Sequence, residues 1–406
     1  MKICFYNVTA SYIHGGLETY CWEAGRALAR RGHHVNILAG TGGTARHNEV
    51  TLVQFPFTRD ERWPDFGTRF RRLMERMSFA RHSMRHLLAA RYDAVIVNKP
   101  FDFPTLWRAK ARGLEAQTVF RSGGRDFFCG DRWFAGAVDH WLSTSLYNAR
   151  QVEARYHRPV GVIHNGVDAD EFRPLPRGGE FRTRFGVGTD AFVLVSVGRL
   201  VGLKGLRVVI EALPGLPGAH FIIAGEGPEQ QRLAQRATDL GVAGRVHFAG
   251  RVAHEELPRL LAHADAFVQP SVGEESFGIS IVEAMACGLP VLASSLGGMP
   301  EIVLPGETGE LLPPGDVTAW TAAIGRLVED GGYRRRLGAA GRRRAEEHFT
   351  WAANARQLEA LLWGDNMAGF AAGPLSDDRA GLAGTNTAGL PADGTAPASP
   401  GRQAAR

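Results

Sequence analysis

The segment from residue 274 to residue 294 reads EESFGISIVEAMACGLPVLAS and carries more information than any other part of the chain. Two carboxylates within it, Glu275 and Glu283, stand eight positions apart, with a glycine and an apolar run between them. The run from Ile279 to Cys287 predicts a helix, and the short apolar run 290–293 predicts a buried strand. The segment therefore predicts a loop, a helix and a strand in succession, with one carboxylate in the loop and one on the helix.

Short apolar runs alternate with amphipathic stretches on both sides of this segment. In the second half of the chain, strands are predicted at 192–197, 221–224, 246–248, 266–269 and 290–293, with helices at 205–213, 229–240, 255–263 and 279–287. This alternation favours a parallel sheet that is covered by helices on both faces.

The first half of the chain repeats the pattern. Strands are predicted at 2–8, 34–39, 93–98, 116–121 and 160–163, and a helix at 17–31 ends at Gly32. The segment 165–180, NGVDADEFRPLPRGGE, is rich in proline, glycine and charge, and it predicts the link between two domains. We expect two Rossmann-like α/β domains at 1–170 and 171–349, a helix at 350–365 and a disordered low-complexity tail at 366–406.

The composition is that of a globular protein with a mild basic bias. The chain has 406 residues, 44% of them apolar, and a formal net charge of +5. Such a bias suits phosphate-bearing ligands or an anionic membrane surface. Four well-separated cysteines predict reduced thiols in a cytosolic protein, and neither a signal peptide nor an apolar run of membrane-spanning length is recognisable.

The loop and helix around the two carboxylates suit a nucleotide sugar. Carboxylates accept hydrogen bonds from paired hydroxyls, and a helix N-terminus offers free amides to a phosphate or a sugar oxygen. We expect the amides of Ser276, Phe277, Gly278 and Ile279 to face such a donor. The alternative is a pair of surface glutamates that flank an ordinary amphipathic helix.

Further loops that follow predicted strands carry glycines and cations. The segment 198–205 reads GRLVGLKG, and two cations at the end of a strand can bind a diphosphate and offset charge on a leaving group. His14-Gly15-Gly16-Leu17-Glu18 follows the first strand, and 225–229, GEGPE, follows another. The alternatives are a solvated basic turn and plain turn chemistry.

These motifs together resemble family 4 retaining glycosyltransferases, which carry the GT-B fold and an E-x7-E signature. The resemblance covers about residues 1–365. It implies two Rossmann-like domains that face one another across a cleft, with the helix at 350–365 crossing back to the first domain. It also implies a reaction without a cofactor or a required metal ion, with a nucleoside-diphosphate sugar as co-substrate.

The resemblance also assigns residue roles. Arg199 and Lys204 would stabilise the diphosphate, Glu275 would contact the donor sugar and Glu283 the ribose. The remaining donor-site residues would be Gly15, Gly16 and Gly225, together with the amides named above. Arg251 and Val252 would also belong to the donor site, since they lie where the family places the backbone that binds the base. Glu274 is expected to be solvated.

One departure from the family concerns the acceptor side. Many members carry a histidine after a strand of the first domain, whereas the matching stretch here, 118–126, reads TVFRSGGRD. Arg121, Ser122, Arg125 and Asp126 are therefore the candidates for the acceptor side.

A basic amphipathic helix is predicted in the first domain. Its apolar positions are Phe70, Leu73, Met74, Met77, Met84, Leu87 and Leu88, and its basic positions are Arg69, Arg71, Arg72, Arg76, Arg81 and Arg85. Such a helix can lie on an anionic membrane. The alternative is a helix that packs on the first sheet and turns a basic face to solvent.

We therefore expect a glycosyltransferase that moves a sugar from a nucleoside-diphosphate sugar to an acceptor hydroxyl with retention, in the synthesis of a cell-surface polysaccharide, glycolipid or glycoconjugate. The acceptor would be a saccharide or a lipid-linked group, with no nucleic-acid partner. The expected location is the cytoplasm, with peripheral contact to the inner face of the membrane. The alternatives are a non-catalytic GT-B protein that binds sugar nucleotides and a related phosphorolytic or sucrose-type enzyme.

Overall fold

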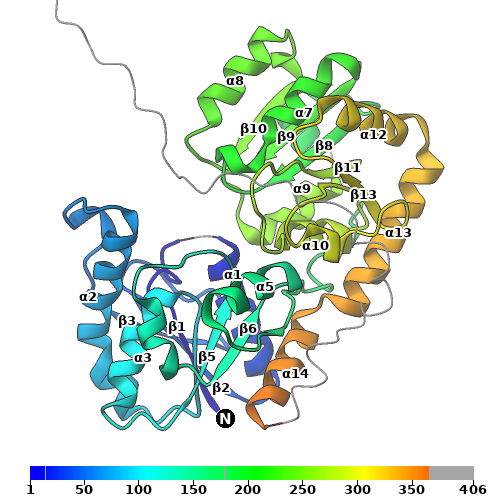
Figure 1. Ribbon diagram of the computed structural model, residues 1–406. Coiled ribbons are helices and arrows are strands. Elements are labelled where there is room, and N and C mark those ends of the chain that lie inside the picture. Colours follow the sequence, from blue (N-terminus) through cyan, green and yellow to red (C-terminus); the bar gives the residue numbers. More distant parts are fainter. Residues whose placement is uncertain (14, 178–179, 365–406) are drawn as a thin grey trace, which may run out of the picture. The chain divides into compact units, whose positions relative to one another are not determined.

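A computed structural model describes residues 1–13, 15–177 and 180–364 (Figure 1). All of these residues belong to one compact unit. His14, residues 178–179 of the predicted link and the predicted tail 366–406 lie outside the described residues. All four cysteines are free.

The first half of the chain forms a seven-stranded sheet in which every pair is parallel. The strand order is β3-β2-β1-β4-β5-β6-β7. The strands are β1 Lys2–Tyr6, β2 His34–Gly40, β3 Thr51–Phe55, β4 Ala94–Val97, β5 Gln117–Ser122, β6 His140–Ser143 and β7 Gly161–Val162. The order reverses between β1 and β4, and in open parallel sheets such a switch point is where ligands bind, at the carboxyl ends of the strands.

Helices cover both faces of this sheet (Figure 1). They are α1 Gly16–Arg30, α2 Thr68–Ala89, α3 Phe103–Lys110, α4 Asp131–Phe134 and α5 Leu146–Tyr156, with 3-10 turns η1 Asp60–Arg62, η2 Pro100–Asp102 and η3 Ala135–Ala137. Strand side chains alternate between the two faces, so Phe5 packs on the α1 side and Tyr6 on the α2 and α3 side.

Helix α2 uses its apolar face to pack on this sheet. Met84 and Leu87 are buried in the same cluster as Phe79, while Leu73 and Met77 are half-buried. The packing supports the interpretation of α2 as a sheet-covering helix. Arg76 was expected on the solvated basic face, but it is buried and its Nη1 lies 2.6 Å from Oδ2 of Asp102, because that buried carboxylate needs a cationic partner.

The second half of the chain forms a six-stranded parallel sheet in the order β10-β9-β8-β11-β12-β13. Its strands are β8 Phe192–Val197, β9 Ala219–Ala224, β10 Val246–Gly250, β11 Ala266–Gln269, β12 Val291–Ser294 and β13 Gly309–Leu312. Strands β11 and β12 are buried along their whole length, as continuous apolar runs predict for a sheet covered on both faces. The order reverses between β8 and β11, which is the second switch point.

Two apolar clusters lie one on each face of this sheet and contain the buried apolar residues of most helices of this half. These helices are α7 Leu206–Ala212, α8 Gln230–Asp239, α9 Leu257–Ala262, α10 Ile279–Ala286, α11 Met299–Ile302, α12 Val317–Glu329 and α13 Gly331–His348. The short helix α6 Glu180–Arg184 precedes β8, and the 3-10 turns are η4 Gly202–Lys204, η5 Leu213–Gly215, η6 Ala243–Arg245 and η7 His254–Glu256. Strand β7 and strand β8 lie on either side of residue 170, where we propose that one domain ends and the next begins.

The final described helix, α14 Trp351–Leu362, returns to the first sheet (Figure 1). It starts at Thr350, whose hydroxyl accepts a hydrogen bond from the amide of Ala353, as a helix N-cap does. Its buried residues share an apolar cluster with those of α1. The carboxylate of Glu359 accepts a hydrogen bond from Nε of Arg31 at 2.6 Å and lies 2.8 Å from Nε2 of His33.

Candidate functional site

Two loops of the second sheet meet at its switch point. One follows β8 and contains Lys204, and the other follows β11 and contains Glu275. Nζ of Lys204 donates a hydrogen bond to Oε2 of Glu275 at 2.6 Å, and each side chain is about a quarter exposed. Nε2 of Gln269, at the end of β11, lies 3.4 Å from the same oxygen. Two residues predicted to bind the donor are therefore neighbours, and in the free protein they form an ion pair.

Glycines shape the backbone around Glu275. Gly278 begins α10 with a φ of 108°, which an L side chain rarely adopts. Gly297 has a φ of 65°, and a Cβ there would collide with the carbonyl oxygen of Glu275. The next amide, that of Gly298, donates to this same carbonyl at 2.9 Å. Gly297 and Gly298 thus pack against the backbone of Glu275 and hold its loop in place, a role that the sequence alone did not reveal.

Arg199 lies in the same β8 loop as Lys204. Its side chain is exposed, and within the described ranges no ion pair engages it. The loop is fixed beneath it, because the amide of Leu200 donates to the carbonyl of Glu226 at 2.9 Å. Gly225 belongs to that second loop, and its amide donates to the carbonyl of Gly250 at 2.7 Å. The loops after β8 and β9 and the end of β10 are therefore joined by backbone hydrogen bonds, with the exposed Arg199 beside them.

The second carboxylate of the E-x7-E pair lies on α10. Glu283 is 5% exposed, and its Oε1 lies 2.8 Å from Nε2 of His254. His254 follows Arg251 and Val252, the residues predicted to border the base. Arg251 is exposed and Val252 packs partly against the apolar cluster of this half. The histidine is a residue that the sequence analysis missed, since an isolated histidine carries no motif.

The first glycine loop adjoins α10. Gly15 is the N-cap of α1, and a Cβ on Gly16 would lie 3.6 Å from Cδ1 of Ile279. Glu18, in the first turn of α1, is buried and accepts a hydrogen bond from Oγ1 of Thr9 at 2.6 Å. The N-termini of α1 and α10 are thus in contact range, which brings Gly15 and Gly16 to the donor loops of the second sheet.

The predicted acceptor residues separate into buried and exposed members. Arg121 is 1% exposed, stacks on the ring of Tyr20 at 3.5 Å and donates from Nη2 to Oδ1 of Asn165 at 2.5 Å. Burial lowers the pKa of its guanidinium. Ser122 is also buried, and its hydroxyl donates to the carbonyl of Gly124. Both side chains are buried and hydrogen-bonded within the protein, so neither is accessible to an acceptor in this structure.

The other two predicted acceptor residues are the exposed Arg125 and the half-buried Asp126. Nη1 of Arg125 lies 2.6 Å from Oε1 of Glu274, so Glu274 is ion-paired where free solvation was expected. Asp126 is paired with Lys99 and with Arg72. Burial alone would raise the pKa of Asp126, but these two cations outweigh burial and hold the pKa below its usual range.

A carboxylate of the second half also caps a helix of the first. Oε2 and Oε1 of Glu301 accept hydrogen bonds from the amides of Leu146 and Tyr147 at 2.8 and 2.9 Å, at the start of α5. Nε2 of His164 lies 3.2 Å from the same carboxylate. Negative charge at a helix N-terminus is favourable. Glu301 therefore ties the two sheets together beside the site, and no local sequence signal indicated this contact.

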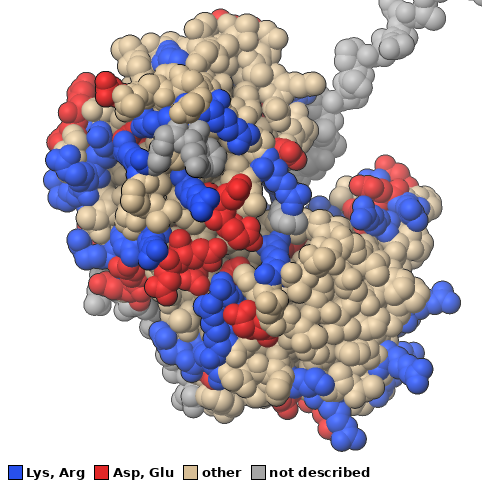
Figure 2. Space-filling model, turned by 180° about the vertical axis from the view of Figure 1, so that it is seen from behind, with Lys and Arg blue, Asp and Glu red and all other residues tan. Residues whose placement is uncertain are grey.

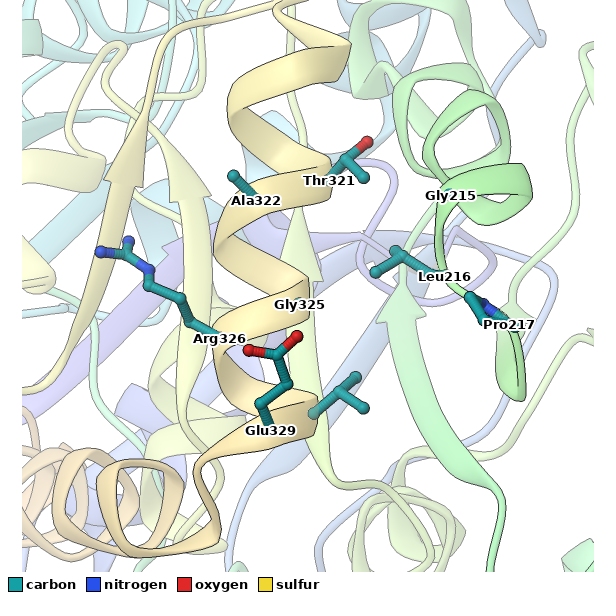
Figure 3. Close-up of a pocket in the computed structure, with 9 residues that line it drawn as sticks. Gly215, Leu216, Pro217, Thr321, Ala322, Gly325, Arg326 and Glu329 are labelled. Carbon is teal, nitrogen blue, oxygen red and sulfur yellow. The ribbon is translucent and has the colours of Figure 1, made fainter.

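A cavity of about 370 Å³ lies elsewhere on the second half, between η5 and α12 (Figure 3). It is lined by Gly215, Leu216, Pro217, Thr321, Ala322, Gly325, Arg326, Val328 and Glu329. None of these is a predicted site residue. The cation among them, Arg326, is already paired with Glu310 at 3.1 Å. The cavity does not offer the cation pair that a diphosphate requires.

Two features are absent from the described residues. No group of three or more His, Cys, Asp or Glu side chains within them is placed to hold a metal ion. None of the helices at 1–13, 15–177 or 180–364 has the length and apolar character that crossing a membrane requires.

On the face shown in Figure 2, cationic and acidic side chains are interspersed.

The two parallel sheets, the returning helix α14 and the loops at the second switch point define a GT-B glycosyltransferase. Two family models match the chain: "Glycosyltransferase Family 4" at residues 14–171 and "Glycosyl transferases group 1" at residues 179–344. The chain belongs to glycosyltransferase family 4, which confirms the predicted family.

Named relatives are similar over between about half and most of the chain. A GDP-mannose-dependent alpha-(1-6)-phosphatidylinositol monomannoside mannosyltransferase of Mycobacterium tuberculosis is 37% identical over 380 residues, which cover 87% of this chain and 96% of the relative. The protein of the same name from Mycolicibacterium smegmatis is 40% identical over 64% of this chain and 72% of the relative. A D-inositol 3-phosphate glycosyltransferase of Mycobacterium marinum is 40% identical over 47% of this chain and 42% of its own length.

Solved structures share the fold. Sucrose-phosphate synthase from Thermosynechococcus elongatus superposes with a TM-score of 0.76 at 23% identity, covering 89% of this chain and 98% of that one. Anabaena HepE in complex with UDP and glucose superposes with a TM-score of 0.74 at 24% identity, covering 90% and 100%. The predicted GT-B fold class is thereby confirmed. The family models and the named relatives show that the chain is a glycosyltransferase.

Proposed function

We propose that this protein transfers a mannosyl group from GDP-mannose to a hydroxyl of an inositol-containing glycolipid. The observation that carries the proposal is the 37% identity to a GDP-mannose-dependent mannosyltransferase over 96% of that relative's length. A match of this extent includes both sheets, so it covers the donor side and the acceptor side alike.

The proposed donor contacts follow from the geometry of the second switch point. Lys204 and the exposed Arg199 would bind the diphosphate, because both cations lie in the loop after β8. Glu275 would accept hydrogen bonds from sugar hydroxyls and Glu283 from the ribose. The amides of residues 276–279, at the start of α10, would add hydrogen-bond donors to the donor's oxygen atoms.

The proposed reaction retains the anomeric configuration. The bond between the anomeric carbon and the phosphate oxygen breaks, and a bond from the acceptor oxygen to that carbon forms on the same face. The acceptor's proton passes to the departing phosphate oxygen, so the protein need not supply a general base. Lys204 and Arg199 offset the charge that develops on the leaving diphosphate. With these cations in place, we propose that no metal ion and no cofactor are required.

The proposed acceptor side lies where Arg125 approaches Glu274, with Asp126 next to it in the chain. An inositol glycolipid would present its headgroup there while its acyl chains remain in a membrane. We propose that the protein works in the cytoplasm, on the inner face of the membrane. The exposed arginines of α2, among them Arg69 and Arg81, and Phe66, which is 76% exposed, would meet the anionic surface.

A donor panel tests the proposal. The purified protein is given GDP-mannose, GDP-glucose, UDP-glucose, ADP-glucose or dTDP-glucose, with phosphatidylinositol monomannoside, D-inositol 3-phosphate or no acceptor. We expect a mannosylated lipid only with GDP-mannose and the lipid acceptor, and a loss of at least tenfold in kcat/KM in Glu283→Ala. Preference for another donor, or for inositol phosphate, would overturn the substrate assignment. Donor binding without any product would indicate the non-catalytic sugar-nucleotide-binding protein.

A vesicle experiment tests the membrane contact separately. The protein is sedimented with neutral vesicles and with vesicles that contain anionic lipid, at low and at high salt. We expect binding to anionic vesicles only, weakened by salt. Equal sedimentation with both kinds of vesicle, or with neither, would contradict the proposed peripheral location.

A further inference from the structure

The ribose carboxylate proposed above has a single protein partner. Among the described residues, the only side chain that hydrogen-bonds to Glu283 is His254, with 2.8 Å between Nε2 and Oε1. The carboxylate is 7% exposed and the histidine side chain 23% exposed. The side chain of Glu283 is therefore largely shielded from bulk water, and one ring nitrogen is the side-chain partner that orients it.

The histidine is held in place from a second direction. Its ring packs on that of Phe172 with 5.1 Å between the ring centroids and an angle of 53°. Phe172 belongs to the link between the sheets and is 1% exposed. Because the aromatic contact and the hydrogen bond fix the ring together, His254 offers its Nε2 to Glu283 in one orientation.

The surroundings of His254 are acidic. Burial alone would lower the pKa of His254. The charge and hydrogen bond of Glu283 outweigh burial and, together with the charges of Glu23 on α1 and Glu171 in the link, raise this pKa to about 9. Glu23 is itself bonded to His47 at 2.8 Å, and Glu171 lies 3.7 Å from Arg26. At neutral pH the ring is a cation, so both of its nitrogens are donors.

A carboxylate held in this way suits a vicinal diol. Each oxygen of an ionised carboxylate can accept about two hydrogen bonds. His254 occupies one position on Oε1, which leaves a second position there and those of Oε2. Two acceptor oxygens at a fixed orientation match the 2′ and 3′ hydroxyls of a ribose.

We infer that His254 is a positioning residue for the donor ribose, which holds Glu283 in a fixed orientation and thereby selects ribonucleotide over 2′-deoxyribonucleotide donors. The inference rests on the proposed function, since it takes Glu283 as the ribose ligand. His254 also stands two residues after Val252 and so connects the loop proposed to border the base with the carboxylate proposed to bind the ribose.

The test compares His254→Leu, which removes the donor nitrogen, with His254→Gln, which keeps a neutral donor near that place. The control is His220→Gln on β9, a half-buried histidine whose partner is His247 at 3.0 Å. Affinity is measured by calorimetry with GDP and 2′-deoxy-GDP, or with the corresponding pair for the nucleoside diphosphate that the wild type prefers. Donor KM and kcat are measured in parallel.

We expect His254→Leu to bind GDP at least tenfold more weakly, to raise donor KM equally and to change kcat less than twofold, because the ribose is remote from the breaking bond. The preference for GDP over 2′-deoxy-GDP should fall at least fivefold. His254→Gln should retain part of both at pH 7, and His220→Gln should match the wild type.

The pH dependence separates positioning from a purely structural role. The wild type should lose GDP affinity as the pH rises through about 9, where His254 loses its charge. His254→Gln titrates the same ligand without that charge change, so its affinity should vary less over the same range.

The outcomes distinguish the inference from the proposed function. If His254→Leu binds GDP more weakly but keeps the ribose preference, the residue is only structural and the inference fails. If His254→Leu behaves as the wild type while Glu283→Ala loses GDP, the inference fails and the proposed donor site stands. If Glu283→Ala binds GDP normally, the proposed site itself is wrong.

Discussion

Replacing Lys204 with alanine is expected to abolish most of the turnover while leaving the fold intact. Its ammonium group lies 2.6 Å from Glu275 in the free protein and would meet the diphosphate in the complex. The variant removes one of two cations that would stabilise the leaving group, and it leaves Arg199 in place. The loss should therefore appear in kcat more than in donor KM.

The magnitude follows from the position of the pair. Removing one preorganised electrostatic group from a site where charge develops typically costs about 10² to 10³ in kcat, or roughly 2.7–4 kcal/mol. The cost in stability is smaller, since both side chains of the pair are about a quarter exposed. Pairs near the surface contribute up to about 1 kcal/mol, which corresponds to a decrease in Tm of roughly 1–2 °C for a unit of this size.

The assay measures product formation at saturating and limiting donor, with thermal unfolding of the same preparation. Arg207→Ala is the matched control. Arg207 lies three residues further on in α7, its side chain is 71% exposed and its partner Glu211 is 3.5 Å away. This control removes a nearby cation that does not face Glu275, so its kcat should stay within twofold of the wild type.

A kcat for Lys204→Ala within about threefold of the wild type, with an unchanged Tm, would refute this assignment. The assignment would also fail if Arg207→Ala lost as much activity, because the effect would then reflect net charge alone. A large loss of Tm in Lys204→Ala would show that the ion pair is a structural element of the loop.

Further predictions concern the interface, the metal requirement and pH. Glu301→Ala should lower the Tm through the loss of about 1–2 kcal/mol at the start of α5, whereas Glu307→Ala, an exposed neighbour, should not. Turnover should persist in excess EDTA, and a tenfold loss that Mg²⁺ restores would contradict the metal-free proposal. Burial alone would raise the pKa of Glu359, but the hydrogen bonds from Arg31 and His33 outweigh burial and lower it. Its contribution is therefore full at neutral pH and is lost on acidification, so Glu359→Gln should be about 1–3 kcal/mol less stable at pH 7, with a smaller deficit below about pH 4 in chemical denaturation.

Much of the fold could be predicted because buried parallel strands are continuous apolar runs. Strands β8 and β11 were predicted at their observed bounds. Strand β3, TLVQF, was missed because it is an edge strand that is exposed or half-buried throughout, so its pattern resembles a loop. Strand β13, GELL, was missed because it is short and only its first and last residues are buried.

The candidate site could be predicted from the sequence only where its residues lie together in one short segment. The loops after β8 and β11 contain glycines and charges at a strand end, which is a local signal. The partners of these residues are supplied by distant segments. His254 reaches Glu283 from 29 positions away, and Glu301 reaches α5 across 155 positions. No local pattern encodes such pairs, because they depend on where the sheets place their loops.

The burial of an arginine is likewise difficult to predict from the local sequence. Composition and periodicity assign an arginine to the surface, since burial of a charge is costly. Arg121 is nevertheless enclosed by Tyr20, Asn165 and the carbonyl of Ile163, which offset that cost with ring stacking and hydrogen bonds. Because these partners come from α1 and from the chain after β7, the burial of Arg121 became apparent only with the three-dimensional structure.

If Lys204 and Glu275 bind the donor as proposed, their resting ion pair sets a condition that the ligand must meet in two parts. A free phosphate could attract the lysine, but it would leave the half-buried glutamate without its partner. A free sugar could satisfy the glutamate but would gain nothing from the lysine. Only a molecule that carries an anion and hydroxyls at the right separation compensates both ends of the broken pair. The abundant phosphates and sugars of a cell would thus be poor competitors for this site, even without any steric barrier.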